Sequence, residues 1–223
     1  MSGEAPHMAR GNQSSGQRFN LHPSMGRPRP DHFIGVRIRS EGLDQVRADI
    51  RKLSPGIEGY EEEGCRAHVT LGVLRLDTEE KVERCVVHFQ RAASKLREGN
   101  HFPAEGFRVS FDGIGMFGSR VLFLNPSKSS VMKLTDMRAC LFDEHVSEFA
   151  TEDKGREYKP HLTIAKQTRR TSKRGKTGSV ATRMPEDASV FGDVRVDVKA
   201  SVTTVELVRM GSDKEEDGVR PLH

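Results

Sequence analysis

The sequence predicts a mixed α/β fold made of two halves with a similar organisation. One observation is a tripeptide that occurs twice, as His68-Val69-Thr70 and as His161-Leu162-Thr163, each time within a short apolar run. The other is that runs typical of strands alternate along the chain with stripes typical of amphipathic helices. One tripeptide falls in each half of the 223 residues, which is consistent with a duplicated α/β unit.

The first half is expected to begin with a strand and a helix. Phe33 and Ile34, followed by alternating Val36 and Ile38, predict a strand over 32–39. Ser40 is placed to cap a helix that the segment Ser54-Pro55-Gly56 ends. The apolar residues that recur at helical spacing in between are Leu43, Val46, Ile50 and Leu53. The acidic segment 58–64 is then a loop that leads into the first tripeptide strand, 66–74.

A second helix and a strand pair are expected in the middle of the chain. Asp77-Thr78-Glu79-Glu80 resembles a capping box, and an apolar stripe follows it. The stripe consists of Val82, Cys85, Val86, Phe89, Ala93 and Leu96. Segments 107–111 and 120–124 predict strands joined by a turn in the glycine-rich segment 113–118. That segment lacks the Gly-Lys-Ser/Thr ending of a phosphate loop, so we interpret it as structural, with Phe117 as a candidate ligand contact.

The second half is expected to contain a strand, a helix and a tripeptide strand as well, in an order that the sequence does not fix. Ser129 or Ser130 is placed to cap a third helix. Its apolar residues are Leu134, Met137, Leu141, Phe142 and Phe149. The second tripeptide strand covers 159–165, and a final strand covers 203–210.

The two tripeptides predict a shared polar surface. Residues i and i+2 of a strand share a face, so His68 and Thr70 project together, as do His161 and Thr163. Two such strands side by side would supply a general base, a general acid and two hydroxyl donors for the non-bridging oxygens of a phosphodiester. This chemistry needs no metal. One copy alone is a weak motif, because Thr favours strands and a half-buried His is common; the pair carries the prediction.

Charge is unevenly distributed along the chain. The chain has 36 Lys and Arg residues and 32 Asp and Glu residues, which gives a net charge of +4 and a sequence pI of about 9.0. A basic run follows the second tripeptide, within a loop that we place at 166–188. Such a loop would attract a polyanion, with Lys166, Arg169 and Arg170 as candidate substrate contacts. A solvated loop and a nuclear localisation signal remain alternative interpretations.

Cysteine content and hydropathy indicate the compartment in which the protein is expected and whether it is expected to contact a membrane. The three cysteines form no Cys-x-x-Cys pair and lie far apart in the sequence, so neither a zinc site nor a disulfide framework is predicted. The absence of a disulfide pattern fits a protein of a reducing compartment, the cytoplasm or the nucleus. No apolar stretch is long enough to cross a bilayer, and no membrane partner is expected. Composition predicts a disordered tail over 1–30, one domain over 31–211 and a flexible tail over 212–223.

Three further segments extend the pattern beyond the tripeptides, namely 29–34, 111–118 and 158–163. With them the sequence resembles the two-histidine phosphoesterase superfamily, and within it the branch that contains the phosphoesterase-like domain of an A-kinase anchoring protein. The resemblance covers about residues 29 to 210. It implies a bilobal, duplicated fold of two antiparallel-rich sheets flanked by helices, with both tripeptide strands at a central cleft.

The resemblance also implies cofactor-free and metal-independent chemistry on 2′,5′-linked oligonucleotides or 2′,3′-cyclic phosphate RNA ends. His68 and His161 would be acid and base, in an order that the sequence does not assign, and Thr70 and Thr163 would hold the phosphate. Tyr158, like Phe117, is a candidate for stacking on a base, although core packing is an alternative role. An ordinary imidazole titrates near pH 6.5, so a bell-shaped pH dependence is expected.

Two other interpretations of the site stay open. A module that binds a nucleotide monophosphate such as AMP or CMP without turnover would use the same four side chains. A histidine-based metal site is weaker, because no carboxylate or cysteine lies at ligand spacing from either tripeptide. Expected partners are therefore an RNA or oligonucleotide substrate or a nucleotide monophosphate. The chain ends shortly after the last strand with the acidic segment 213–217, so we expect no kinase-anchoring helix, and we expect a monomer.

Overall fold

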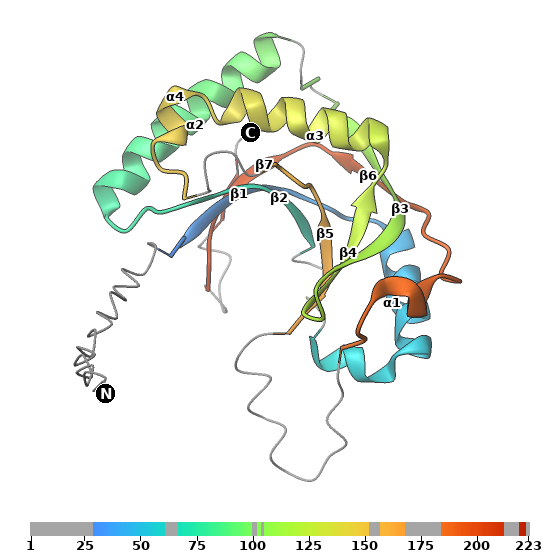
Figure 1. The fold of residues 1–223 in the computed structure, drawn as a ribbon. Helices are drawn as coiled ribbons and strands as arrows, with labels where there is room; N and C mark the ends of the chain where they lie inside the picture. Colours follow the sequence, from blue (N-terminus) through green and yellow to red (C-terminus); the bar gives the residue numbers. More distant parts are fainter. Residues whose placement is uncertain are drawn as a thin grey trace, which may run out of the picture.

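The central feature of the fold is an antiparallel sheet, curved so that the helices lie on its outer side (Figure 1). The computed structural model describes residues 29–60, 67–99, 102–103, 105–151, 157–167, 184–211 and 219–221. In this part of the chain the sheet has eight strands in the order β6-β3-β4-β5-β2-β1-β7-β8. The strands are β1 (His32–Arg37), β2 (His68–Leu74), β3 (Phe107–Phe117), β4 (Val121–Pro126), β5 (Leu162–Lys166), β6 (Val198–Val202), β7 (Val205–Arg209) and β8 (Val219–Pro221).

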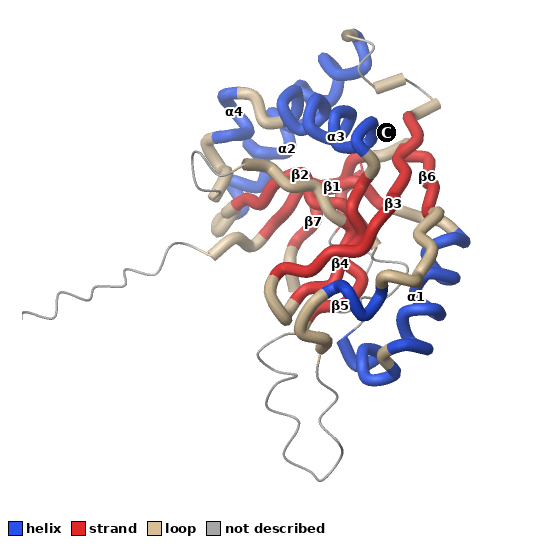
Figure 2. Tube along the Cα trace, turned by 45° about the vertical axis from the view of Figure 1, so that its right-hand side comes forward, coloured by secondary structure: helices blue, strands red, loops and turns tan. Residues whose placement is uncertain are grey.

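The helices form two groups on the sheet. α2 (Glu79–Glu98), α3 (Lys128–Leu141) and the short α4 (Glu144–Ser147) lie together, and α3 packs on β2, β3 and β4. α1 (Glu41–Leu53) lies apart from them, against β6 and the 3-10 helices η1 (Pro55–Tyr60) and η4 (Ala188–Phe191) (Figure 2). No helix among the described residues is both long and apolar enough to span a bilayer.

The predicted duplication is visible in the strand order. β1, α1 and β2 follow one another in the chain, as do β4, α3 and β5, and in both cases the two strands are antiparallel neighbours. The second strand of each unit carries or directly follows a tripeptide histidine. β2 and β5 are themselves neighbours, through the pairing of Val69 with Leu162. The mixed α/β class is thus confirmed, and the two expected sheets are the two halves of one continuous sheet.

The core lies on the helix-covered face and spans both halves. Strand residues that are fully buried there include Ile34, Val36, Val69, Leu122 and Leu162. They belong to one cluster with the apolar residues of α1, α2 and α3. In α2, the buried residues recur at intervals of three and four, which is the spacing of one helix face; they are Cys85, Phe89, Ala92 and Leu96.

Several predicted boundaries are corrected by the structure. β3 runs through the glycine-rich segment to Phe117, because its backbone stays paired with β4, and the turn follows at Gly118, where φ is +53°. The cap of α3 is Ser127, whose hydroxyl accepts from the backbone N–H of Ser130. Ser130 is instead buried, and its hydroxyl accepts from the backbone N–H of Ser110 at 2.8 Å. Phe142 and Phe149 lie beyond the end of α3.

Two strands were not predicted. β6 alternates buried and exposed residues, and it pairs with the first half of β3. β8 pairs with β7, and it lies within the segment 212–223 that was predicted as a flexible tail. The backbone hydrogen bonds with β7 are what make this segment of three residues a strand. The remaining predicted tail residues 1–28, 212–218 and 222–223, and residues 168–183 of the basic loop, lie outside the described residues.

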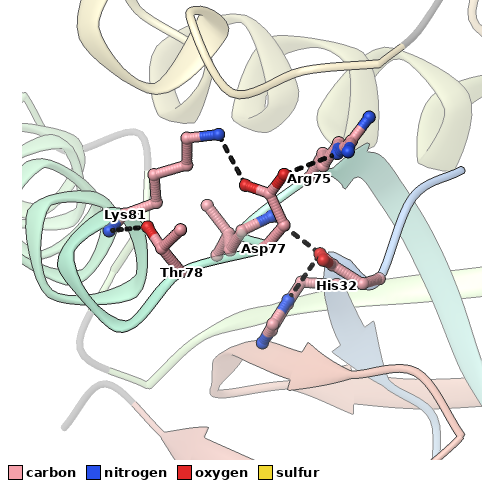
Figure 3. A network of polar contacts seen from close by, with 7 residues as sticks. His32, Arg75, Asp77, Thr78 and Lys81 are labelled. Carbon is pink, nitrogen blue, oxygen red and sulfur yellow. Dashed lines mark hydrogen bonds and ion pairs between the residues drawn. The ribbon is translucent and has the colours of Figure 1, made fainter. Parts of the chain in front are cut away.

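A polar network ties the start of β1 to the end of β2 and the start of α2 (Figure 3). Asp31 Oδ1 accepts from the backbone N–H of Leu76 at 2.7 Å and contacts His32 Nδ1 at 2.8 Å. Asp77 accepts from Arg75 and Lys81, and the Thr78 hydroxyl caps α2 by accepting from the Lys81 backbone N–H. Thr78 is therefore the cap, but position three of the helix is a lysine, and the reciprocal half of a capping box is not made.

Candidate active site

The four tripeptide side chains lie on the face of the sheet opposite the core. Val69 and Leu162 are paired and fully buried, so their neighbours along each strand point the other way. Continued by one residue on either side of this pair, the antiparallel register sets His68 opposite Thr163 and Thr70 opposite His161. All four residues are half-buried. The two imidazoles and two hydroxyls of the predicted polar surface therefore lie together, where the two halves of the sheet meet.

Each tripeptide is followed by a β-bulge. On β2, Thr70 pairs with Gly35 and Gly72 pairs with Ile34, so Leu71 is the extra residue. On β5, Thr163 pairs with Phe123 and Ala165 pairs with Leu122, so Ile164 is the extra residue. A bulge bends the strand and redirects the side chains beside it. Its occurrence directly after both threonines makes the two halves of the site alike in backbone as well as in residue type.

His68 is held against a phenylalanine. The rings of Phe33 and His68 are stacked, with centroids 4.4 Å apart and an interplanar angle of 21°. Phe33 can lean along β1 towards His68 because Gly35 has no side chain: a Cβ at Gly35 would lie 3.1 Å from the Phe33 ring and 3.0 Å from the Val69 carbonyl oxygen. The aromatic contact therefore depends on glycine at the position opposite Thr70.

His161 has a corresponding aromatic environment on the other half. Its ring meets Phe117 edge-on, with centroids 4.9 Å apart, and Phe123 at 5.4 Å. Phe117 and Phe123 are stacked at 4.3 Å, and Phe123 lies over Gly115, where a Cβ would come within 2.6 Å of its ring. His161 Nδ1 is 2.9 Å from the Lys159 carbonyl oxygen. A carbonyl only accepts, so Nδ1 is the donor of this hydrogen bond and carries its proton.

Phe117 and Lys166 lie at the rim of the same face. Phe117 pairs with Val121 across β3 and β4, and Val121 pairs with Lys166 across β4 and β5. Directly paired residues share a face, so both side chains are on the side of the sheet that carries Phe123 and Thr163. Phe117 is 40% exposed, and Lys166 is exposed at the end of β5. Arg169 and Arg170 lie outside the described residues.

Tyr158 is engaged with the protein itself. Its hydroxyl donates to the Thr70 carbonyl oxygen at 3.0 Å, and its ring packs against the core. The Arg138 guanidinium lies 5.0 Å from the centre of that ring. The structure therefore joins Tyr158 to the backbone of the first tripeptide.

One charged pair on the site face was not predicted. Arg37 is directly opposite His68, and its guanidinium makes a bidentate contact with Glu206, with distances of 2.6 to 3.1 Å. Both side chains are largely buried, 21% and 13% exposed respectively. The signal in the sequence is an arginine in a strand that is mostly apolar, but its acidic partner is 169 residues away and no local pattern connects them.

Among the described residues, no group of three or more His, Cys, Asp or Glu side chains has the arrangement of a metal site. Cys85 is not a candidate nucleophile, because burial, with a smaller effect of the Glu148 charge, raises the pKa of its thiol to about 12. The imidazoles and hydroxyls of the tripeptides are the candidate reactive groups on this face of the sheet.

A family model described as AKAP7 2'5' RNA ligase-like domain matches residues 30–219. A search of curated protein sequences found no match.

The fold is similar to those of several solved structures. E. coli LigT in complex with 3'-AMP is 18% identical, with a TM-score of 0.55, and the match covers 86% of this chain and 94% of that one. Kluyveromyces marxianus Usb1 is 13% identical, with a TM-score of 0.50 and coverage of 87% and 98%. A structure described only as a phosphoesterase is 16% identical, with a TM-score of 0.50 and coverage of 87% and 96%.

Proposed function

The chain belongs to the family of AKAP7 2'5' RNA ligase-like domains, within the two-histidine phosphoesterase superfamily, and from this premise we propose that it is a metal-independent phosphodiesterase. Its proposed substrates are 2′,5′-linked oligonucleotides or RNA ends that carry a 2′,3′-cyclic phosphate. The observation that carries the proposal is the pairing of Val69 with Leu162, because this pairing brings His68, Thr70, His161 and Thr163 to one face of the sheet.

For a 2′,5′ linkage the proposed reaction is an internal transfer. One histidine takes the proton of the free 3′ hydroxyl, and that oxygen attacks phosphorus. The other histidine, protonated, donates to the departing 5′ oxygen as its bond to phosphorus breaks. Thr70 and Thr163 donate hydrogen bonds to the non-bridging oxygens, whose charge is stabilised in the transition state. The products are a 2′,3′-cyclic phosphate and a 5′ hydroxyl.

An existing 2′,3′-cyclic phosphate would be opened by water instead. The basic histidine deprotonates the water, its oxygen attacks phosphorus, and the acidic histidine protonates the ribose oxygen that leaves. In both reactions His161 would exchange its proton at Nε2, since Nδ1 donates to the Lys159 carbonyl. The two histidines then end in exchanged protonation states and must be reset before the next turnover.

Four residues are proposed substrate contacts, and two of them, Phe117 and Lys166, lie at the rim of the described site. Phe117 presents an exposed ring that can stack on a base, and Lys166 shares its face of the sheet. Arg169 and Arg170 follow Lys166 closely in the sequence and would attract the phosphate backbone. The complex of the similar LigT structure with 3'-AMP supports a nucleotide as the ligand class.

The test is cleavage of 2′,5′-linked oligoadenylate beside a 3′,5′-linked control, in the presence of a chelator. We expect the 2′,5′ substrate to be cleaved and His161→Ala or His68→Ala to lower kcat by about 10²- to 10⁴-fold, the usual contribution of a general acid or base. The rate should fall on both sides of a pH optimum, because one imidazole must be neutral and the other protonated.

Each other result has a defined meaning. Activity that the chelator abolishes would replace the two-histidine mechanism with a metal-dependent one. Cleavage of 2′,3′-cyclic phosphate ends alone would assign the second substrate class. If neither substrate is cleaved and AMP or CMP still binds, the protein is a nucleotide-binding module.

A further inference from the structure

The two halves of the candidate site are joined by few backbone contacts. In the described residues, the register between β2 and β5 consists of the single pair Val69 and Leu162. Thr70 therefore lies at the point where the ladder between the two tripeptide strands stops. The relative position of Thr70 and His161 therefore depends on further contacts, and the side chains of Tyr158 and Arg138 make two of them.

Tyr158 bridges the two tripeptides. Its hydroxyl donates to the Thr70 carbonyl oxygen at 3.0 Å, and its backbone is three residues before His161. The hydrogen bond thus continues the link between the strands beyond the last ladder pair. A short connection of this kind leaves little freedom for His161 to move relative to Thr70.

Arg138 on α3 holds both Tyr158 and the bulge. Its Nε donates to the Leu71 carbonyl oxygen at 2.7 Å, and Leu71 is the extra residue of the bulge on β2. The same guanidinium lies 5.0 Å from the centre of the Tyr158 ring and 5.3 Å from that of Phe142. Phe142 in turn occupies the space that a side chain at Gly72 would need, within 2.2 Å of a Cβ there.

We propose that Tyr158 and Arg138 are positioning residues that set the distance between the two halves of the active site. Their side chains donate hydrogen bonds to two consecutive backbone carbonyls, those of Thr70 and Leu71, from the helix-covered side of the sheet. The contact with the Leu71 carbonyl stabilises the bulge, and the contact with the Thr70 carbonyl ties this bulge to the segment that carries His161. This role rests on the proposed function, because it matters for catalysis only if the tripeptides act together.

The planar geometry of Arg138 is part of the inference. A guanidinium can donate in its own plane while its faces stack on aromatic rings, which a lysine ammonium cannot do. Arg138→Lys should therefore behave like Arg138→Met and should not restore wild-type behaviour. Removing only the Tyr158 hydroxyl should also lower kcat, since the ring remains but the hydrogen bond to the Thr70 carbonyl is lost.

The experiment compares Tyr158→Phe, Arg138→Met and the double variant with the wild-type protein, with two readouts. The first is kcat and KM on 2′,5′-linked oligoadenylate. The second is the nitrogen NMR spectrum of the imidazoles of His68 and His161, which reports their environment without any turnover. Arg84→Met is the matched control, because Arg84 also stacks on an aromatic ring, Phe149, but on the exposed surface of α2.

We expect each single variant to lower kcat by about tenfold or more with KM within about threefold, because small displacements of catalytic groups are costly. The kcat of the double variant should be no lower than that of the slower single variant, since both substitutions remove the same link between the Thr70–Leu71 backbone and the segment that carries His161. The imidazole signals should shift in both variants, and Arg84→Met should match the wild type. Wild-type kcat and imidazole signals in Tyr158→Phe, even with a lower Tm, would overturn the proposal.

The two proposals fail in different ways. If the wild-type protein cleaves neither substrate, the proposed function fails, while the imidazole signals of Tyr158→Phe and Arg138→Met still decide whether these residues position the histidines. If the wild type and the His161→Ala variant behave as expected but the positioning variants match the wild type in both readouts, only the positioning role is lost.

Discussion

Single residues in this site show how much a missing side chain can matter. Phe33 lies against Gly35 and stacks on His68, and Phe123 lies over Gly115 and contacts His161. In both halves a glycine lets a phenylalanine ring lie flat on the sheet beside a tripeptide histidine. The imidazoles are thereby confined on one side by an apolar surface, which restricts the orientations that they can adopt.

Gly115→Ala should lower activity, because the new Cβ would lie 2.6 Å from the Phe123 ring and the ring would have to move. Phe123 is only 7% exposed and is in contact with both Phe117 and His161, so its displacement would shift the imidazole. We expect kcat to fall about tenfold or more and stability to fall by about 1–3 kcal/mol, as in overpacked cores. Activity assays and thermal unfolding measure both effects.

Gly113→Ala is the matched control for this substitution. Gly113 is on the same face of β3, but the nearest side-chain atom to a Cβ there is 3.6 Å away, an ordinary contact. The control should retain wild-type kcat. Equal loss of activity in the two variants would show that the strand, rather than the Phe123 ring, is responsible.

At the level of elements, the two bulges and the polar network at the start of β1 determine how the strands enter and leave the site. The bulges at Leu71 and Ile164 follow Thr70 and Thr163 directly and depend on long-range pairing. The network of Asp31, His32 and Leu76 holds the beginning of β1 to the residues just after β2 (Figure 3). Since Phe33 follows His32, this anchor also helps to place the ring that stacks on His68.

The stability contributed by Asp31 should depend on pH. Partial burial raises the pKa of this carboxyl, but the hydrogen bonds from the Leu76 backbone and His32 outweigh it, and the pKa lies below the ordinary 3.8. A lowered pKa means that the unfolded state binds the proton more readily, so the contribution is present above the unfolded pKa and is lost as the pH falls through the folded pKa.

Asp31→Asn should therefore lower the Tm at pH 7 by about 2–4 °C, which corresponds to the loss of about 1 kcal/mol in a domain of this size. The difference from the wild type should shrink as the pH falls below about 4. Thermal unfolding followed by circular dichroism from pH 3 to pH 7 measures it. Asp136→Asn, an exposed position on α3, serves as the control. A difference for Asp31→Asn that is the same at pH 3 and pH 7 would contradict the assignment.

At the scale of the whole molecule, the two halves share one sheet and one core. The buried residues of both halves form a single cluster, and the sheet passes from one half to the other at Val69 and Leu162. The active-site candidates lie at this junction. Their geometry thus depends on the same contacts that hold the halves together.

The described domain should unfold in one cooperative transition, with equal calorimetric and van't Hoff enthalpies. Val69→Ala should destabilise the whole transition by about 2 kcal/mol, as expected for truncation of a fully buried aliphatic residue, without dividing it. Scanning calorimetry of both proteins tests this expectation. Two separate transitions in either protein would show that the halves are independent units.

Local patterns in the sequence predicted most of the elements around the site. The alternation in 66–74 and the helical stripe after Thr78 predicted β2 and α2, because the period of apolar residues is a property of neighbouring positions. Glycine was a less reliable signal: segment 113–118 reads as a turn, yet the chain continues as a strand over Gly113 and Gly115, because β4 pairs with it. Arg47 on α1 is another exception, since it is buried although charged.

The sequence by itself determined the class of the fold, the two tripeptides and the rule that His and Thr of each project together, since all three follow from composition and from spacing within a strand. Only the tertiary structure decided that β2 and β5 are neighbours, that the register sets His68 opposite Thr163, and that Arg37 meets Glu206 and Tyr158 meets Thr70. These contacts join residues far apart in the chain, and their partners are selected by the packing of the whole sheet rather than by any local pattern.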